Sequence, residues 1–385
     1  MKNSSIKILI IFIIITITNS ISLNTVTVVY HPSHLNSVLI EFDAFVEETM
    51  ETWGIPGAAI AIVQSGNTVF MKGYGVRELG QSDAIDDHTV FRIASVSKPF
   101  ASTLTGLLVQ EGILNWDDRI IDYLPDFALQ DTSNTHRLTI RHLLSHTSGL
   151  VPHAFDDLLE SNVPYPKIVE ELKNAPIVNK VGIQYGYQNM LFGLIGDLIE
   201  TATGRSYENL VKDRLFMPLG MKDASMGWDA YMAAPNRAHP HIRRNYLWKV
   251  ARDKQAYYSV LPSAGINASI SDMAQWLRAQ MGGMPEIIPL EVLQETWTPI
   301  IRTPGERRKY YWNGRVRDTY YGMGWRIFDY AGYTMITHSG GIQGYLSQIA
   351  FIPDQNIGIV VLMNSQRIDF LLPTFFDMFL KLNEL

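Results

Sequence analysis

Two side chains in residues 91–102, FRIASVSKPFAS, are of the types that nucleophilic catalysis needs. Ser95 carries a hydroxyl, and Lys98 carries an amine three residues later. A hydroxyl is a poor nucleophile until a neighbouring base takes its proton, and a lysine shielded from water can act as that base. The pair therefore predicts a reaction in which Ser95 attacks a carbonyl carbon.

Ser4 and Lys7 have the same spacing, so the spacing alone does not identify a catalytic pair. The sequence around Ser95 distinguishes it from such a chance match. Pro99 is tolerated in the first turn of a helix, where the backbone N–H that it lacks has no partner. Apolar residues at helical spacing follow, and a glycine ends the run: Leu104, Leu107, Leu108 and Gly112. We therefore expect Ser95 at the start of a helix, with Lys98 on the same face one turn later.

The pattern Tyr-x-Asn offers a second polar group for such a cleft, and one of its three occurrences is in a suitable place. Tyr187 and Asn189 stand in a loop directly before the apolar stretch MLFGLIGDLIE. Tyr207 falls within a helical run, and Tyr311 stands in a loop rich in arginine and aromatic residues. We therefore expect Tyr187 and Asn189 to point into the cleft.

A third motif lies near the C-terminus, where YTMITHSGG is predicted as a strand. It contains His338, Ser339 and Gly340, followed by Gly341. A basic residue, a hydroxyl and a glycine at a strand edge can line a cleft, and the glycine lets a substrate lie close to the backbone.

The elements that must position these motifs follow from apolar periodicity. Residues 35–53 have helical spacing, and AAIAIVQ and TVFMKGYG flank the hairpin signal Ser65-Gly66-Asn67. Near the C-terminus, YTMITHSG, YLSQIAFI and IGIVVLMN are predicted as strands, and residues 370–382 as an apolar helix. The pattern between these two groups of strands is mainly helical.

These elements predict an α/β fold. One antiparallel sheet is built from N- and C-terminal segments, is flanked by helices, and has a mainly helical region inserted in it. We expect a single catalytic domain over residues 23–385. Its α/β part comprises residues 33–94 and 265–385, and its mainly helical part comprises residues 95–264.

The first 22 residues have the plan of a secretory signal peptide, with two lysines, an apolar run and then small residues. The apolar run, residues 8–17, is shorter than the about 20 residues that a spanning helix needs. We therefore expect cleavage near Ser22, no stable membrane span afterwards, and a periplasmic or secreted protein. The absence of cysteine excludes a disulfide and a thiolate metal site.

Charge and histidine spacing bear on partners and cofactors. The formal net charge is −6, and residues 1–22 hold two lysines and no acids, so their removal gives −6 − 2 = −8. This acidity disfavours a nucleic-acid partner. Two histidine pairs, His142 with His146 and His239 with His241, lack a third ligand or the Glu of a His-Glu-x-x-His site. We expect no metal and no cofactor.

Taken in order, the three motifs resemble those of the serine β-lactamase and penicillin-binding protein superfamily, in its class C β-lactamase and DD-peptidase branch. The segments EGILNWDDRIIDYLP, LTIRHLLSHTSGL and SAGINASISDMAQWL are similar to segments common in this branch. The resemblance covers nearly the whole chain after residue 22. It implies a β-lactamase/transpeptidase-like fold.

The resemblance also implies a chemical role for the first two motifs. Ser95 would form an acyl-enzyme, with Lys98 and Tyr187 sharing the proton transfers and water completing the hydrolysis. The backbone N–H groups of Ser95 and Gly341 would form the oxyanion hole. Asn189 would hold the amide of the substrate.

The third motif would bind the other end of the substrate. The resemblance implies that His338 and Ser339, with Gly340 beside them, face a substrate carboxylate. Most β-lactamases of this branch have lysine where this chain has His338, and the histidine is similar to that of some DD-peptidases and D-aminopeptidases. An imidazole has an ordinary pKa of about 6.5, so a His338 that binds a carboxylate would bind it more weakly as the pH rises and the ring loses its proton.

Together these observations predict an exported serine hydrolase that acts through an acyl-enzyme on an amide bond, a class C-like β-lactamase. The alternatives are a DD-carboxypeptidase or D-aminopeptidase, an esterase of the same fold, and a penicillin-binding sensor that is acylated without turnover. The substrate would be a small molecule or a peptide. A Gly-x-Ser-x-Gly elbow is absent, so an esterase would also have to use Ser95.

Overall fold

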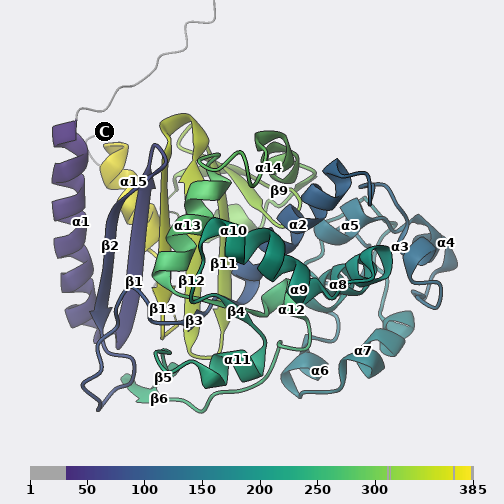
Figure 1. The fold of residues 1–385 in the computed structure, drawn as a ribbon, viewed down its shortest axis with the longest axis horizontal. Helices are drawn as coiled ribbons and strands as arrows, with labels where there is room; N and C mark the ends of the chain where they lie inside the picture. Colours follow the sequence, from purple (N-terminus) through teal and green to yellow (C-terminus); the bar gives the residue numbers. More distant parts are fainter. Residues whose placement is uncertain (1–31, 310–311, 313, 367–368, 383–385) are drawn as a thin grey trace, which may run out of the picture.

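The computed structural model of the chain describes residues 32–309, 312, 314–366 and 369–382. The predicted signal peptide, the Ser4–Lys7 pair and Tyr311 lie outside the described residues. An antiparallel sheet occupies the centre of the molecule, with α1 at one side and a large group of helices at the other (Figure 1).

The central sheet is built from both ends of the chain, as the sequence predicts. Its eight strands lie in the order β2-β1-β13-β12-β11-β10-β9-β8, and each neighbouring pair is antiparallel. The N-terminal and C-terminal parts meet where β1 pairs with β13, with Ile60 opposite Val361. The strands are β1 (Gly57–Gln64), β2 (Asn67–Gly75), β8 (Ile301–Arg302), β9 (Val316–Tyr321), β10 (Arg326–Tyr330), β11 (Tyr333–Ile342), β12 (Tyr345–Ile352) and β13 (Ile357–Met363).

Both faces of the sheet are buried, which explains why its central strands are almost continuously apolar. Alternate residues of β1 belong to two separate cores, Ala59 and Ala61 to one and Ile60 and Ile62 to the other. The helices α1 (Pro32–Trp53) and α15 (Leu371–Phe379) cover the face of the second core. Helix α15 is shorter than the predicted helical segment 370–382.

Helices cover the other face and form the inserted region. The first core joins the sheet to α2 (Lys98–Gln110), α13 (Ile270–Gln280) and α14 (Leu290–Trp297). The remaining helices of the region are α3 (Ile120–Tyr123), α4 (Thr132–Arg137), α5 (Ile140–Leu144), α6 (Asp156–Glu160), α7 (Tyr165–Glu171), α8 (Asn189–Thr203), α9 (Tyr207–Val211), α10 (Met217–Leu219), α11 (Trp228–Ala233) and α12 (Leu261–Ala264). Within the described ranges, no helix combines the length and apolar character needed to cross a bilayer.

Short strands interrupt the mainly helical region. A three-stranded sheet in the order β3-β7-β4 combines β3 (Phe91–Arg92), β7 (Ile266–Ala268) and β4 (Ser225–Met226). A separate hairpin consists of β5 (His241–Arg244) and β6 (Leu247–Val250). The first of these sheets matters for the site because β3 leads directly into the turn that holds Ser95.

Candidate active site

Ser95 lies in a single 3₁₀ turn, η1 (Ala94–Ser97), between β3 and α2. The predicted placement at the start of a helix is confirmed, with the serine in the turn that precedes the α-helix. Ala94 has φ = +47°, a left-handed conformation that is uncommon for a residue with a side chain and that is found at functional sites. This turn presents the half-buried Ser95 to a cleft of about 340 Å³. The cleft is lined by Ala94, Ser95, His153, Asp156, Glu160, Tyr187, Asn189, Tyr257, Ala264, Gly341 and Ile342.

Lys98 is fully buried directly behind the nucleophile. Its Nζ lies 3.3 Å from Ser95 Oγ, 2.8 Å from Asn189 Oδ1 and 3.1 Å from the carbonyl oxygen of Ser263. Burial lowers the pKa of Lys98 well below its usual range; the positive charge of Arg326 acts in the same direction and the carboxylate of Asp156 opposes it.

A neutral Lys98 has the hydrogen-bonding pattern of a base for Ser95. A neutral amine has two N–H donors and one lone pair. Asn189 Oδ1 and the Ser263 carbonyl accept from the two donors. The lone pair is then left to accept the proton of the Ser95 hydroxyl, which is the activation that an alcohol nucleophile needs.

Tyr187 completes this group from the loop before α8. Its ring centre lies 4.7 Å from Lys98 Nζ, and its hydroxyl is hydrogen-bonded to Ser95. Burial raises the pKa of the Tyr187 phenol, more than the hydrogen bond with Ser95 lowers it. A phenol that stays protonated can donate a proton but cannot take the first one, so Lys98 is the better base of the two.

The sequence predicts Asn189 in the loop just before the helix. In the structure, Asn189 is the first residue of α8. Its Nδ2 donates to Asp156 Oδ2 at 2.9 Å, while its Oδ1 faces Lys98. His153 Nδ1 also donates to Asp156 Oδ2, at 2.8 Å. A hydrogen-bonded chain thus runs from His153 at the cleft surface to the amine beside the nucleophile.

Strand β11 forms the opposite wall of the cleft, and its two glycines differ in the space available for a side chain. A Cβ on Gly340 would lie 2.3 Å from the carbonyl oxygen of Ile93 and 2.8 Å from the backbone nitrogen of Ser95, so only glycine allows this contact. A Cβ on Gly341 would meet nothing within 4 Å, because this residue faces the open cleft. The backbones of Ser95 and Gly341 therefore line one cleft, as an oxyanion hole requires.

His338 lies behind the cleft, although the family resemblance implies that it faces a substrate carboxylate. Its ring is fully buried, Nδ1 donates to the Ser339 carbonyl oxygen at 3.0 Å, and Nε2 accepts from the Tyr321 hydroxyl at 3.1 Å. Burial lowers the pKa of His338 well below its usual range, and the charges of Arg326 and Lys98 act in the same direction. The ring is therefore neutral, and neither it nor Ser339 is among the residues that line the cleft.

An ion pair that sequence patterns do not reveal supports Tyr187 from behind. Arg326, the first residue of β10, pairs with Glu306 at 3.0 Å. Its guanidinium lies 5.8 Å from the ring centre of Tyr187 and 5.6 Å from that of Tyr321. The pair keeps a positive charge close to Lys98 and to the phenol of Tyr187.

The histidine pairs that could suggest a metal have other partners. His146 packs against Tyr187, with ring centres 4.3 Å apart, and its Nδ1 accepts from the Gln188 N–H at 3.2 Å. His142 forms a capping box with Thr139 at the start of α5. Within the described part of the chain, no three potential ligands come together around a metal position.

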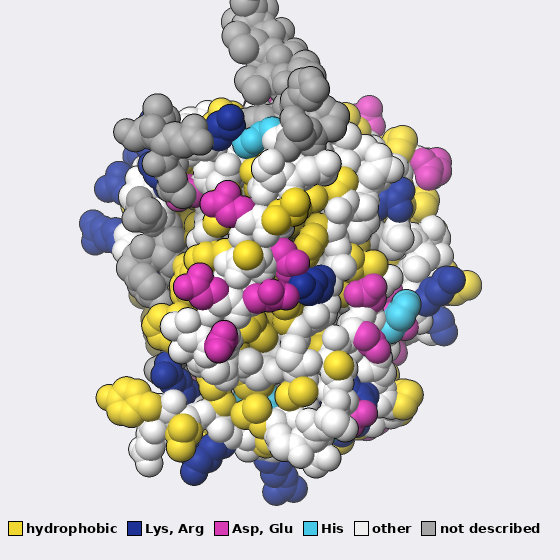
Figure 2. All heavy atoms as spheres, turned by 90° about the vertical axis from the view of Figure 1, so that its left-hand side faces the viewer, with side chains coloured by type: hydrophobic (Ala, Val, Ile, Leu, Met, Phe, Trp, Pro, Cys, Tyr) yellow, Lys and Arg dark blue, Asp and Glu magenta, His cyan; other side chains and the backbone are white. Residues whose placement is uncertain are grey.

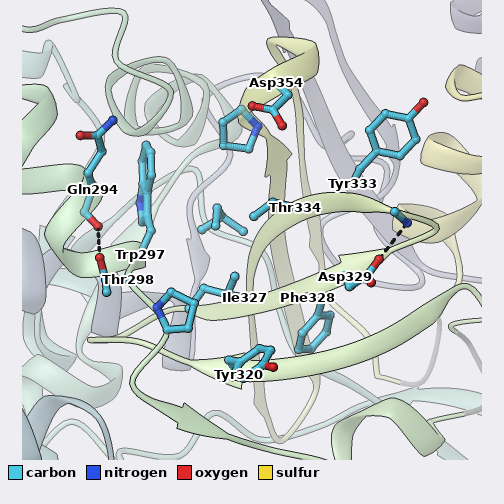
Figure 3. A pocket seen from close by; sticks show the side chains of 14 residues that line it. Gln294, Trp297, Thr298, Tyr320, Ile327, Phe328, Asp329, Tyr333, Thr334 and Asp354 are labelled. Atoms are coloured by element: carbon cyan, nitrogen blue, oxygen red, sulfur yellow. Dashed lines mark hydrogen bonds between the residues drawn. The ribbon is translucent and has the colours of Figure 1, made fainter. Parts of the chain in front are cut away.

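The cleft at Ser95 is not the largest hollow of the surface. A hollow of about 600 Å³ lies beside β9, β10 and β11, and its wall includes Trp297, Tyr320, Asp329 and Asp354 (Figure 3). Thr298 Oγ1 donates to the Gln294 carbonyl oxygen there. The residues around this hollow do not pair a nucleophile with a base, so we place the chemistry in the smaller cleft.

The fold is that of the β-lactamase and penicillin-binding protein superfamily. The chain belongs to the Beta-lactamase family, which matches residues 42–371. The solved structure of the octameric penicillin-binding protein homologue from Pyrococcus abyssi has the same fold, with a TM-score of 0.78. That likeness covers 89% of this chain and 77% of the other at 24% sequence identity, and so bears on the fold alone.

Two curated proteins are similar in sequence to most of this chain. Protein flp of Staphylococcus aureus is 26% identical over 338 residues, and the unguisins hydrolase ungD of Aspergillus violaceofuscus is 25% identical over 357 residues. Both alignments cover 84% of this chain, and they cover 62% and 61% of the two relatives. The chain thus spans about three fifths of the length of these relatives.

Proposed function

We propose that this protein is an exported hydrolase that cleaves an amide bond through an acyl-enzyme on Ser95, with a β-lactam of the class C type as the first candidate substrate. The observation that carries the proposal is the position of Lys98. Its buried amine lies 3.3 Å from Ser95 Oγ, and in its neutral form, with two N–H groups donated to Asn189 and Ser263, it has a lone pair left for the Ser95 hydroxyl. The family supports a hydrolase, and the N-terminal sequence pattern supports export.

The reaction would begin when Lys98 takes the proton of Ser95 and Oγ attacks the carbonyl carbon. Negative charge on the carbonyl oxygen would face the backbone N–H groups of Ser95 and Gly341. The leaving nitrogen would receive a proton from the Tyr187 hydroxyl, which the Lys98 ammonium would restore. Water would then attack the ester carbonyl, and the same groups would return the proton to Ser95.

The neutral state of His338 favours a second candidate, a peptidase that acts on a D-amino acid peptide or amide. A β-lactamase of this branch usually has a lysine at this position, whereas the ring of His338 is buried and bonded to Tyr321. Without that positive charge, the cleft depends less on a substrate carboxylate. A D-amino acid amide or an ester would then be accepted as well as an anion.

Incubation of the purified protein with a fluorescent penicillin and a chromogenic cephalosporin tests the proposal. Labelling with turnover supports a β-lactamase, and labelling without turnover supports a DD-peptidase or a sensor. If neither labelling nor turnover occurs, D-amino acid amides and aryl esters are the next candidate substrates to test. Ser95→Ala should remove labelling and lower kcat roughly a thousandfold or more for any of them.

A matched control is the change Ser102→Ala. Ser102 is a fully buried serine of α2 whose hydroxyl has no hydrogen-bond partner among the described residues. Its loss should leave labelling and kcat close to those of the parent. Parental activity in the Ser95→Ala variant would reject the acyl-enzyme proposal as a whole.

A further inference from the structure

The hairpin of β5 and β6 has an unusual tip. Its two turn residues, Asn245 and Tyr246, have φ of +50° and +65°. Two-residue hairpin turns with positive φ favour Asn-Gly, and a bulky residue in the second position is uncommon. The turn thus holds a tyrosine in a conformation that suits glycine. Its side chain projects into solvent with 89% of its surface exposed, next to Leu247 with 66% exposed.

The base of the hairpin is fixed to the protein. Trp248 Nε1 donates to the carbonyl oxygen of Trp53, the last residue of α1, at 2.9 Å. Trp53 is itself 44% exposed and Val250 is 42% exposed. The hairpin therefore presents an exposed apolar tip on a rigid support, with further exposed apolar residues at its base.

Positive charge surrounds this tip in a chain that is acidic overall. Residues 241–258 contain five cations and one acid, which gives +4, whereas the whole chain carries −6. Arg243, Arg244 and Lys249 are exposed, and within the described ranges none of the three has an ion-pair partner. Figure 2 shows dark blue and yellow side chains at the lower end of the molecule, where Figure 1 places β5 and β6, and acidic side chains over the middle.

We propose that this hairpin docks on an anionic lipid membrane. Tyr246 and Leu247 would enter the interface, where amphipathic and apolar side chains are stable, and the three cations would contact lipid phosphates. A soluble polyanion would satisfy the charges but offers no apolar phase for the tip. A symmetric contact with a second copy would bring two +4 segments together, which repels.

Docking at this hairpin would bring the cleft close to the membrane. Asp253 and Lys254, directly after β6, line a pocket that shares Glu160, Tyr257 and Gly341 with the cleft of Ser95. The cleft wall thus begins a few residues beyond the hairpin. This inference does not depend on the proposed reaction, because it concerns where the hydrolase works and not what it cleaves.

A fluorescent probe at the tip tests the proposal. The chain has no cysteine, so Asn245→Cys gives a single site for an environment-sensitive dye on the full-length protein. Vesicles of phosphatidylglycerol and phosphatidylcholine should shift its emission to the blue, and vesicles of phosphatidylcholine alone should not. About 1 M NaCl should reduce the effect, since the screening length is then about 3 Å. The same dye on Ser133→Cys, an exposed residue of α4, should not respond.

Charge variants provide the second arm. The triple change Arg243→Gln, Arg244→Gln and Lys249→Gln should lower the partition coefficient on anionic vesicles roughly a hundredfold, at about 1 kcal/mol per cation. A control triple removes three other exposed cations, Arg137, Lys167 and Lys212, and should bind like the parent. Both triples change the net charge equally and leave the cleft unaltered.

Three results would overturn the proposal. One is vesicle binding in which the Asn245→Cys probe stays in water, which would mean that another segment holds the membrane. Another is equal binding by the two triple variants. The third is a blue shift that grows with protein concentration without vesicles, which would indicate a contact between copies of the chain.

Discussion

The side-chain amide of Asn189 joins Lys98 to Asp156. Asn189 Oδ1 accepts from Lys98 Nζ at 2.8 Å, and Asn189 Nδ2 donates to Asp156 Oδ2 at 2.9 Å. The two contacts fix the orientation of the amide, because turning it would place N–H groups against an amine and oxygen against a carboxylate. Asp156 therefore positions the group that positions the base, and its charge also acts on Lys98 directly.

The first prediction concerns the pH dependence of hydrolysis in two charge variants. The base form of Lys98 is needed, so kcat/KM should rise with pH through the pKa of this lysine. The negative charge of Asp156 raises that pKa and the positive charge of Arg326 lowers it. Asp156→Asn should therefore move the acid limb to lower pH, and Arg326→Gln should move it to higher pH.

Profiles of kcat/KM against pH for the parent and both variants check this prediction. A merely structural role for either residue would lower the plateau without moving the limb. A change His153→Gln serves as the control, because the amide of glutamine can also donate a hydrogen bond to Asp156. If Asp156→Asn and Arg326→Gln shift the limb in the same direction, Lys98 is not the group whose titration limits the reaction.

Much of the fold follows from local periodicity. The β1–β2 hairpin, the three C-terminal strands and the first helix lie where the sequence predicts them, because each buries apolar residues at a regular spacing. The hairpin β5–β6 is different, since its Asn245-Tyr246 turn is not a typical hairpin dipeptide. Nothing in its sequence marks it as two strands within a helical region.

The candidate active site likewise contains residues that the sequence predicts and residues that it does not. Ser95, Lys98, Tyr187 and Asn189 come together as expected, because each motif stands at the end of a predictable element. Other members have no such local signal. Asp156 belongs to a short helix, the Arg326–Glu306 pair joins residues 20 positions apart, and the burial of His338 depends on Tyr321 from β9. These contacts arise only when distant segments pack together.

The second prediction concerns His338 and anionic substrates. The ring is neutral because burial lowers the pKa of His338 well below its usual range. KM for an anionic substrate should therefore stay level from about pH 6 to about pH 9, with no change near the ordinary imidazole pKa of about 6.5. KM values for one anionic and one neutral substrate across this range check the prediction. A rise in KM for the anion alone near pH 6.5 would restore His338 as a carboxylate anchor.

The pH dependence of stability gives an independent measure of the protonation state of His338. The unfolded chain binds a proton at His338 below about pH 6.5 and the folded chain does not, so the folded state loses stability as the pH falls through this value. His338→Gln removes that proton and should make the free energy of unfolding less dependent on pH there. His338→Lys would place an ammonium in the buried site and should cost roughly 3 kcal/mol. Urea denaturation at several pH values distinguishes the three proteins.

The third prediction concerns residues 1–22. We expect this segment to be removed on export, so its deletion should not affect the mature protein. The shortened protein should fold and keep the kcat/KM of the parent, and protein recovered outside the cytoplasm should have an intact mass that starts near residue 23. A shortened protein that folds but is inactive would contradict the assignment of this segment as a removable signal.

The last prediction compares the two glycines of β11. Gly340→Ala would place a methyl group 2.8 Å from the Ser95 nitrogen and 2.3 Å from the Ile93 carbonyl oxygen, so the turn of the nucleophile must shift. Overpacking of this kind costs about 1–3 kcal/mol in the free energy of unfolding, and a displaced nucleophile lowers kcat/KM about a hundredfold. Gly341→Ala meets no atom within 4 Å and should change stability by less than about 0.5 kcal/mol.

Urea denaturation and kcat/KM for the two glycine variants separate packing from substrate contact. Gly341→Ala adds a methyl group to the open cleft, so it should change KM according to the size of the substrate while the folded state stays intact. Gly340→Ala should lower kcat for every substrate, because the displaced atoms belong to the enzyme. Parental kcat in a stable Gly340→Ala protein would mean that β11 does not hold Ser95 in place, and the oxyanion hole would then have to be sought elsewhere.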